Sequence, residues 1–127
     1  LRQLIDCKHD ACLAISRKIV KEEEVKVQMI NQRIKAIGKE IEPAKAHGEF
    51  VGVAKFSREI TEPFKKSLDQ VVAEGKVQAF FEAAVDRLLS DYNVYAVDVS
   101  DLPCVEVDTY DDYNRARQIY LKSAKAR

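Results

Sequence analysis

Glu106 and Asp108 are the residues whose types and spacing most directly indicate chemistry. They lie in the segment 105–109, where apolar and acidic residues alternate. This alternation predicts a strand over 104–108 whose two carboxylates share one face, about 6 to 7 Å apart along the chain. Mg²⁺ is commonly held by one or two carboxylates together with phosphate oxygens of a substrate. The pair therefore indicates a metal and phosphate site, although on spacing alone solvated carboxylates at a strand end are the commoner case.

A helix is expected directly after this pair. Thr109 fits the N-cap position, and Asp111 and Asp112 would fall in the first turn, where negative charge interacts favourably with the helix dipole. The inner face of this helix is expected at residues spaced three and four apart, namely Tyr113, Ala116 and Tyr120.

Length and charge narrow the function classes. The chain has 127 residues, which fits one domain, and its 21 basic and 21 acidic side chains balance. A nucleic-acid-binding protein usually carries a basic excess, and a membrane helix needs about 20 consecutive apolar residues. We therefore expect neither nucleic acid nor a membrane as a partner. Because the chain opens without Met or a secretory pattern, we expect it to be a fragment of a longer protein.

Three cysteines, Cys7, Cys12 and Cys104, cannot all pair within one chain. With no sign of export, we expect reduced thiols and a cytoplasmic location. His9 lies between the first two cysteines and could serve as a zinc ligand. Structural zinc is nevertheless disfavoured, because no second Cys/His pair follows.

Apolar patterning predicts an alternating order of strands and helices. Strands are expected at 11–15, 25–29, 33–37, 50–56, 94–99 and 104–108. The strands within 25–37 should form an antiparallel two-stranded arm with a polar outer face. Segment 50–56 is almost continuously apolar, which predicts a strand buried on both faces, with Gly52 and Ala54 leaving the middle of one face shallow.

Two amphipathic helices are expected between these strands. The first begins after Ser57 or Thr61 and ends at Gly75, and the second runs from Val77 to Leu89 and belongs to the core. Strands alternating with helices predict an α/β fold, in which helices flank a mixed, mostly parallel sheet.

The segments 48–57, 94–99 and 102–109, with the helix after Val77 between them, resemble the C-terminal part of the nucleoside triphosphate transferase family. The branch that the chain resembles is the phosphocholine and 2-aminoethylphosphonate cytidylyltransferases. This resemblance implies a Rossmann-like sheet and Mg²⁺-dependent transfer of a nucleotidyl group to a phosphate or phosphonate acceptor, with release of pyrophosphate. CTP is the nucleotide that it implies.

The resemblance also implies site residues. Asp108 matches the second metal-binding carboxylate of the family, and Glu106 matches the acidic residue that accompanies it. Cys104 departs from the pattern, because relatives usually carry a large aromatic residue there. The glycine-rich nucleotide loop and the first metal-binding Asp are not found in the sequence. Residues 1–127 are therefore expected to be the C-terminal part of one nucleotidyltransferase domain, inactive without its nucleotide-binding part.

The acceptor contacts are expected at Lys55, Phe81 and Glu82. An amine on the acceptor would favour an aromatic face and a carboxylate, and Lys55 could meet a phosphate. The alternatives are a buried phenylalanine, a solvated glutamate and an exposed lysine at a strand end.

Two other functions stay open. The chain could be a non-catalytic α/β module for dimerisation or ligand binding, with 25–37 as the interface of a homodimer. Alternatively, it could belong to a sugar-1-phosphate nucleotidyltransferase. Whether the chain belongs to an enzyme is thus undecided by the sequence.

Overall fold

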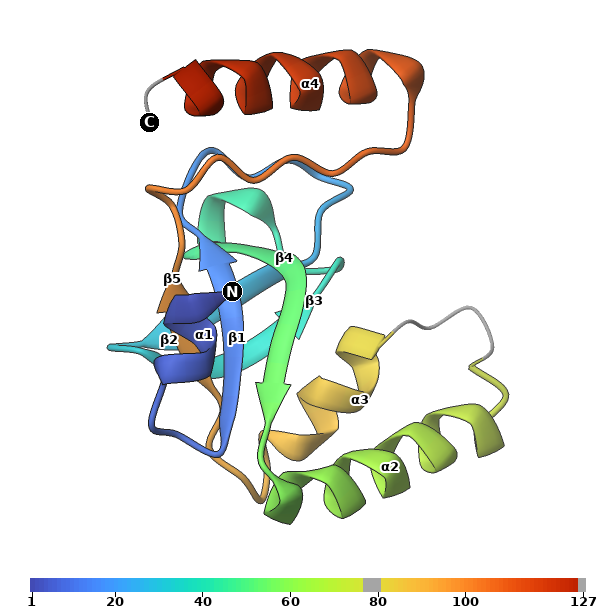
Figure 1. Cartoon of the computed structure of the whole chain (residues 1–127). Helices are drawn as coiled ribbons and strands as arrows, with labels where there is room; N and C mark the ends of the chain where they lie inside the picture. Colours follow the sequence, from blue (N-terminus) through green and yellow to red (C-terminus); the bar gives the residue numbers. More distant parts are fainter. Residues whose placement is uncertain (77–80, 126–127) are drawn as a thin grey trace.

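Five strands close into a barrel in the order β1-β4-β2-β3-β5 in the computed structural model, which describes residues 1–76 and 81–125 (Figure 1). The bounds of these strands are Ala11–Ser16 for β1, Lys26–Ile30 for β2, Arg33–Gly38 for β3, Gly48–Phe56 for β4 and Tyr95–Asp98 for β5. Helices α2 (Arg58–Ala73) and α3 (Phe81–Leu88) pack together beside the barrel. The predicted mixture of helices and strands is confirmed.

The expectation of a mostly parallel, Rossmann-like sheet is wrong for the described residues. Only β1 and β5 pair in parallel, whereas the β1–β4, β2–β3, β2–β4 and β3–β5 pairs are antiparallel. The connections explain this difference. A parallel pair needs a long crossover, but β2 and β3 are joined by a two-residue turn in which Asn31 has a positive φ of 55°.

The predicted ribbon within 25–37 forms, with Lys26 opposite Gly38 and Ile30 opposite Arg33. It does not project as an arm. The side chains of Val27, Ile34 and Ile37 are at most 1% exposed, and they belong to the barrel core. The ribbon is therefore part of the barrel wall, because burying these apolar side chains is worth more than leaving them in water.

Strand β4 is not buried on both faces as expected. Its register against β1 shifts between Leu13 and Ile15, and this irregularity leaves Val51, Gly52 and Val53 opposite a single residue of β1. Gly52 adopts a φ of 80°, and Val53 is 41% exposed. A bulge of this kind bends a strand and turns part of it toward solvent.

The core lies inside the barrel and between the barrel and helices α2 and α3. Phe50 and Phe56 of β4 meet Phe64 of α2 and Phe81 of α3, with ring centroids 4.8 to 6.1 Å apart. These rings pack against the fully or almost fully buried core, which includes Leu13, Ile15, Ile34, Val85 and Val94. The core role predicted for α3 is confirmed, while residues 77–80 of the expected helix lie outside the described residues.

Helix α2 begins after Ser57, one of the two expected caps, although the Ser57 hydroxyl makes no capping hydrogen bond. Pro63 consequently lies inside the helix rather than in its first turn. Proline has no backbone N–H, so this helix gives up one internal hydrogen bond at that point.

The strand expected at 104–108 is not formed, and that segment has no regular secondary structure. Strand β5 already pairs with β1 and β3, so no strand edge beside β5 is open to it. Helix α4 (Tyr110–Lys125) follows and lies at the opposite end of the molecule from α2 and α3 (Figure 1). Its expected inner face is uncovered by the described chain, because Tyr113 and Tyr120 are 53% and 70% exposed.

The expectation that the cysteines are all reduced is also wrong. A disulfide joins Cys7 and Cys12 and closes the loop between helix α1 (Arg2–Asp6) and β1, while Cys104 is an exposed thiol. The cysteine argument for a cytoplasmic location therefore loses its basis. The chain also contains a short 3-10 helix, η1 (Pro43–Lys45), and no helix within the described ranges is long and apolar enough to cross a membrane.

Candidate functional site

Glu49 lies where strands β1, β4 and β2 meet, at one end of the barrel. It is the second residue of β4, and its backbone is paired with Ser16 of β1 and Lys26 of β2. The carboxyl group of Glu49 forms a hydrogen bond with the carboxylate of Glu24, which lies in the turn before β2. Two half-buried carboxyl groups thus share one position.

Burial raises the pKa of Glu49 to about 7, and the hydrogen bond and negative charge of Glu24 act in the same direction. Burial acts on Glu24 too. There, however, the hydrogen bond to Glu49, a hydrogen bond from the Lys21 backbone and the nearby Lys21 and Lys26 charges outweigh it, so the pKa of Glu24 is lowered. Below pH 7 the pair therefore holds about one proton, mainly on Glu49, and it loses this proton as the pH rises through about 7.

Lys26 fixes the turn that carries Glu24. Its side chain is 0% exposed, and its Nζ donates to the backbone carbonyls of Glu22 and Glu24, the latter at 2.9 Å. The Lys21 backbone N–H donates to Glu24 Oε2 at 2.7 Å. A buried ammonium requires such acceptors, so the lysine holds the turn against the barrel end.

Glu106 belongs to the same neighbourhood, because its negative charge also raises the pKa of Glu49. Glu106 and Asp108 themselves are exposed and lie on an irregular segment rather than on one face of a strand. Glu24, Glu49 and Glu106 therefore make an acidic region at the end of the barrel, which we call the acidic site. Asp108 lies two residues beyond it along the chain.

The acidic site has the oxygen donors that Mg²⁺ prefers. In the part of the chain that the structure describes, however, no group of three or more His, Cys, Asp or Glu side chains is arranged to hold one metal ion. Glu106 and Asp108 would suit an ion that takes its other ligands from phosphate oxygens and water.

The predicted acceptor residues do not converge on this site. Lys55 Nζ donates to the backbone carbonyl of Cys7, at the junction of α1 and β1. Phe81 packs in the aromatic cluster between the barrel and the helices, and Glu82 lines a different depression, beside Lys39 and Arg87.

Glu49, Glu24 and Lys26 were missed by the sequence reasoning. Alternation over 25–29 places Lys26 on a polar outer face, whereas the structure buries it at the junction of two strand pairs. The one available signal was Glu49 itself, a charged residue at the start of a long apolar strand.

Comparison with known proteins supplies the fold class. No family model and no curated protein matches the sequence. Among solved structures, the chain resembles CTP:phosphocholine cytidylyltransferase from Streptococcus pneumoniae, with a TM-score of 0.65 and 16% identity over 88% of this chain and 49% of that one. It also resembles the inositol-1-phosphate CTP transferase from T. maritima, with a TM-score of 0.56 and 18% identity over 84% of this chain and 42% of that one.

These likenesses establish the mixed α/β fold that is present in part of both transferases. The chain spans less than half the length of either neighbour.

Proposed function

We propose that residues 1–127 are the acceptor-side and metal-binding part of a nucleotidyltransferase. The complete protein would move a nucleotidyl group, with CMP as the expected group, from a nucleoside triphosphate to a phosphate or phosphonate acceptor and release pyrophosphate. The observation that carries this proposal is the shared fold with two proteins whose names describe transfer from CTP. The acidic site, to which Glu106 belongs, supports it.

In this proposal Asp108 and Glu106 hold Mg²⁺ together with phosphate oxygens of the substrates. When bound, the ion would neutralise charge on the phosphates. Glu49, partly protonated beside Glu24 at neutral pH, would limit the repulsion that three full negative charges would otherwise create around Glu106. Lys55, Phe81 and Glu82 remain the predicted acceptor contacts, each at its own place in the fold.

Asp108→Asn in the complete protein tests the metal role. Asn preserves the size of the side chain and removes the charge, so turnover should fall about a hundredfold or more, the usual cost of losing one electrostatic contact in the transition state. Glu106→Gln should cause a smaller loss. Pyrophosphate release would be measured across a Mg²⁺ titration with CTP and, in turn, phosphocholine, inositol 1-phosphate and a sugar 1-phosphate.

The matched control is Asp101→Asn, at an exposed residue of the same connection. It should leave turnover and Mg²⁺ dependence unchanged. Wild-type kinetics in Asp108→Asn would remove the metal role. The isolated 127-residue chain should show no turnover, because nothing in its sequence provides the nucleotide loop.

A second candidate is a non-catalytic module, and one observation favours it. The sheet closes on itself within the described residues, as expected of a module that needs no further strands. Such a module would bind CTP neither alone nor in the complete protein. Titration calorimetry of the complete protein with CTP therefore separates the two candidates.

A further inference from the structure

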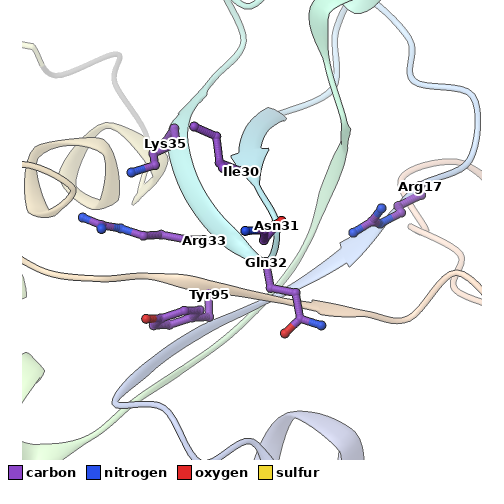
Figure 2. A pocket seen from close by; sticks show the side chains of 7 residues that line it. All are labelled: Arg17, Ile30, Asn31, Gln32, Arg33, Lys35 and Tyr95. Atoms are coloured by element: carbon purple, nitrogen blue, oxygen red, sulfur yellow. The ribbon is translucent and has the colours of Figure 1, made fainter.

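A groove of about 750 Å³ lies on the outside of the barrel, next to the turn between β2 and β3. Basic and aromatic side chains line it, among them Arg17, Arg33, Lys35 and Tyr95 (Figure 2). The groove shares no lining residue with the acidic site. It therefore calls for an explanation of its own.

Strand pairing gives the groove its arrangement. Arg33 and Lys35 are two residues apart on β3, so their side chains leave the same face of the strand. Arg33 is paired with Tyr95 of β5, whose ring stacks on His9 with centroids 3.6 Å apart. Figure 2 shows Lys35, Arg33 and Tyr95 extending in the same direction, with Arg33 in the middle.

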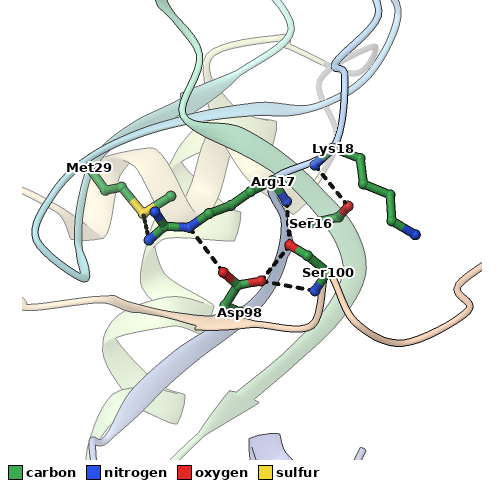
Figure 3. A network of polar contacts seen from close by, with 6 residues as sticks. All are labelled: Ser16, Arg17, Lys18, Met29, Asp98 and Ser100. Atoms are coloured by element: carbon green, nitrogen blue, oxygen red, sulfur yellow. Dashed lines mark hydrogen bonds and ion pairs between the residues drawn. The ribbon is translucent and has the colours of Figure 1, made fainter.

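The positive charge of the groove is only partly neutralised by acidic side chains of the described residues. Arg17 is paired with Asp98 at 3.2 Å, and Asp98 is in turn bound by Ser100 (Figure 3). In contrast, the side chains of Arg33 and Lys35 form no ion pair or hydrogen bond with any described residue. No carboxylate lines the groove. Arg33 and Lys35 leave one face of β3 about 6 to 7 Å apart along the strand, so their charged ends repel each other, and an anion between them would relieve that repulsion.

We propose that this groove binds the phosphate group of a small phosphorylated molecule. The guanidinium of Arg33 presents a planar fork of donors that matches phosphate oxygens, and Lys35 adds a point charge beside it. The amide of Asn31 also lines the groove and offers a further donor, whereas the side chain of Gln32 extends away from Arg33 and Lys35 (Figure 2). A doubly charged phosphate gains more from two cations than a carboxylate does, and the groove has room for the rest of a small molecule.

The test is a titration of the ¹⁵N-labelled 127-residue chain with inorganic phosphate or with CMP, at constant ionic strength held with chloride. The backbone amides of residues 31–35 and of Tyr95 should shift and saturate. The double variant Arg33→Gln/Lys35→Gln should weaken binding at least tenfold. The double variant Arg58→Gln/Lys65→Gln removes the same charge from an exposed face of α2 and should bind as the wild type does.

The two ligands distinguish the sources of the phosphate. Tighter binding of CMP than of inorganic phosphate supports a phosphomonoester as the ligand, whereas saturation with inorganic phosphate alone would overturn the phosphomonoester and assign the groove to free phosphate. Shifts that stay linear with concentration, or equal weakening by both double variants, would overturn the proposal and leave a solvated basic surface. Thermal melts of the two double variants that match the wild-type melt show that the fold is intact.

This proposal does not depend on the nucleotidyltransferase function. Asp108→Asn should leave phosphate binding in the groove unchanged. Loss of groove binding in Arg33→Gln/Lys35→Gln would likewise not bear on the metal role of Asp108, which Asp108→Asn tests separately.

Discussion

Glu49 and Glu24 share a proton at the end of the barrel, with the protonated carboxyl of Glu49 donating to the ionised carboxylate of Glu24. Burial penalises charge on both residues, but their mutual hydrogen bond favours the charged form of Glu24 and the protonated form of Glu49. Lys21 and Lys26 also favour the charged form of Glu24, so the two pKa values move apart. Glu106 adds a negative charge nearby and keeps the proton on Glu49. This pair therefore makes folding stability depend on pH between 4.5 and about 7.

The first prediction concerns Glu49→Gln. The pKa of Glu49 is about 7 in the folded chain against 4.5 as its ordinary value, so between these limits the folded state holds a proton that the unfolded state releases. The free energy of unfolding should therefore fall as the pH rises from 4.5 to about 7 and then level off. Gln keeps a donor for Glu24 and cannot ionise, so the variant should lack this decline.

Urea unfolding on either side of this range measures the effect. Glu49→Gln should be more stable than the wild type on the alkaline side and about equal to it on the acid side. Glu23→Gln, an exposed residue of the same turn, is the control and should keep the wild-type decline. An unchanged pH profile in Glu49→Gln would show that the proton is held elsewhere.

The second prediction concerns Lys26→Met. Met fills a similar volume but cannot donate to the carbonyls of Glu22 and Glu24, which would be left without their partner. We expect a loss of about 1 to 3 kcal/mol in the free energy of unfolding, the usual cost of leaving buried polar groups unpaired. Urea denaturation measures it, with exposed Lys18→Met as the control. Equal stability of the two variants would mean that the turn is held without the ammonium.

The third prediction concerns the start of α4. The Asp112 backbone N–H donates to Thr109 Oγ1 at 3.2 Å, and the Thr109 hydroxyl donates to Asp112 Oδ2 at 2.7 Å. This reciprocal cap lowers the pKa of Asp112, with the Thr109 hydroxyl as the main cause. The stabilisation is therefore present above the ordinary pKa of 3.8 and is lost as the pH falls through the lowered value.

Thr109→Ala should lower the helical circular dichroism signal, because none of the α4 side chains that the structure describes is buried and able to replace the cap. Thr109→Ser retains the hydroxyl and should restore the signal. If Thr109→Ala and Thr109→Ser gave the same signal, the hydroxyl would have no part in starting the helix.

Local patterns were sufficient for many individual elements. Apolar patterning predicted β1, β2 and β3 to within a residue or two, and Thr109 was recognised as the start of α4 from its type and the acidic residues that follow it. These features depend on neighbours in the chain, so the order of residues carries the information.

Strand partners and buried polar groups could not be predicted in the same way. Alternation shows which residues share a face, but it does not say which strand lies alongside, so the antiparallel closure of the barrel was missed. The segment 104–108 alternates like a strand and yet forms none, since no open strand edge lies beside it.

In the acidic site, too, some features could be predicted from the sequence and others depend on the tertiary structure. The types and spacing of Glu106 and Asp108 were visible in the sequence, but the contact of Glu49 with Glu24 joins residues 25 positions apart, and it exists only because β2 and β4 pair at their ends. Burial and the closeness of charges shift a pKa, and both are properties of the packed chain. Residue types thus set which groups can titrate, and the tertiary structure decided which of them do so near neutral pH.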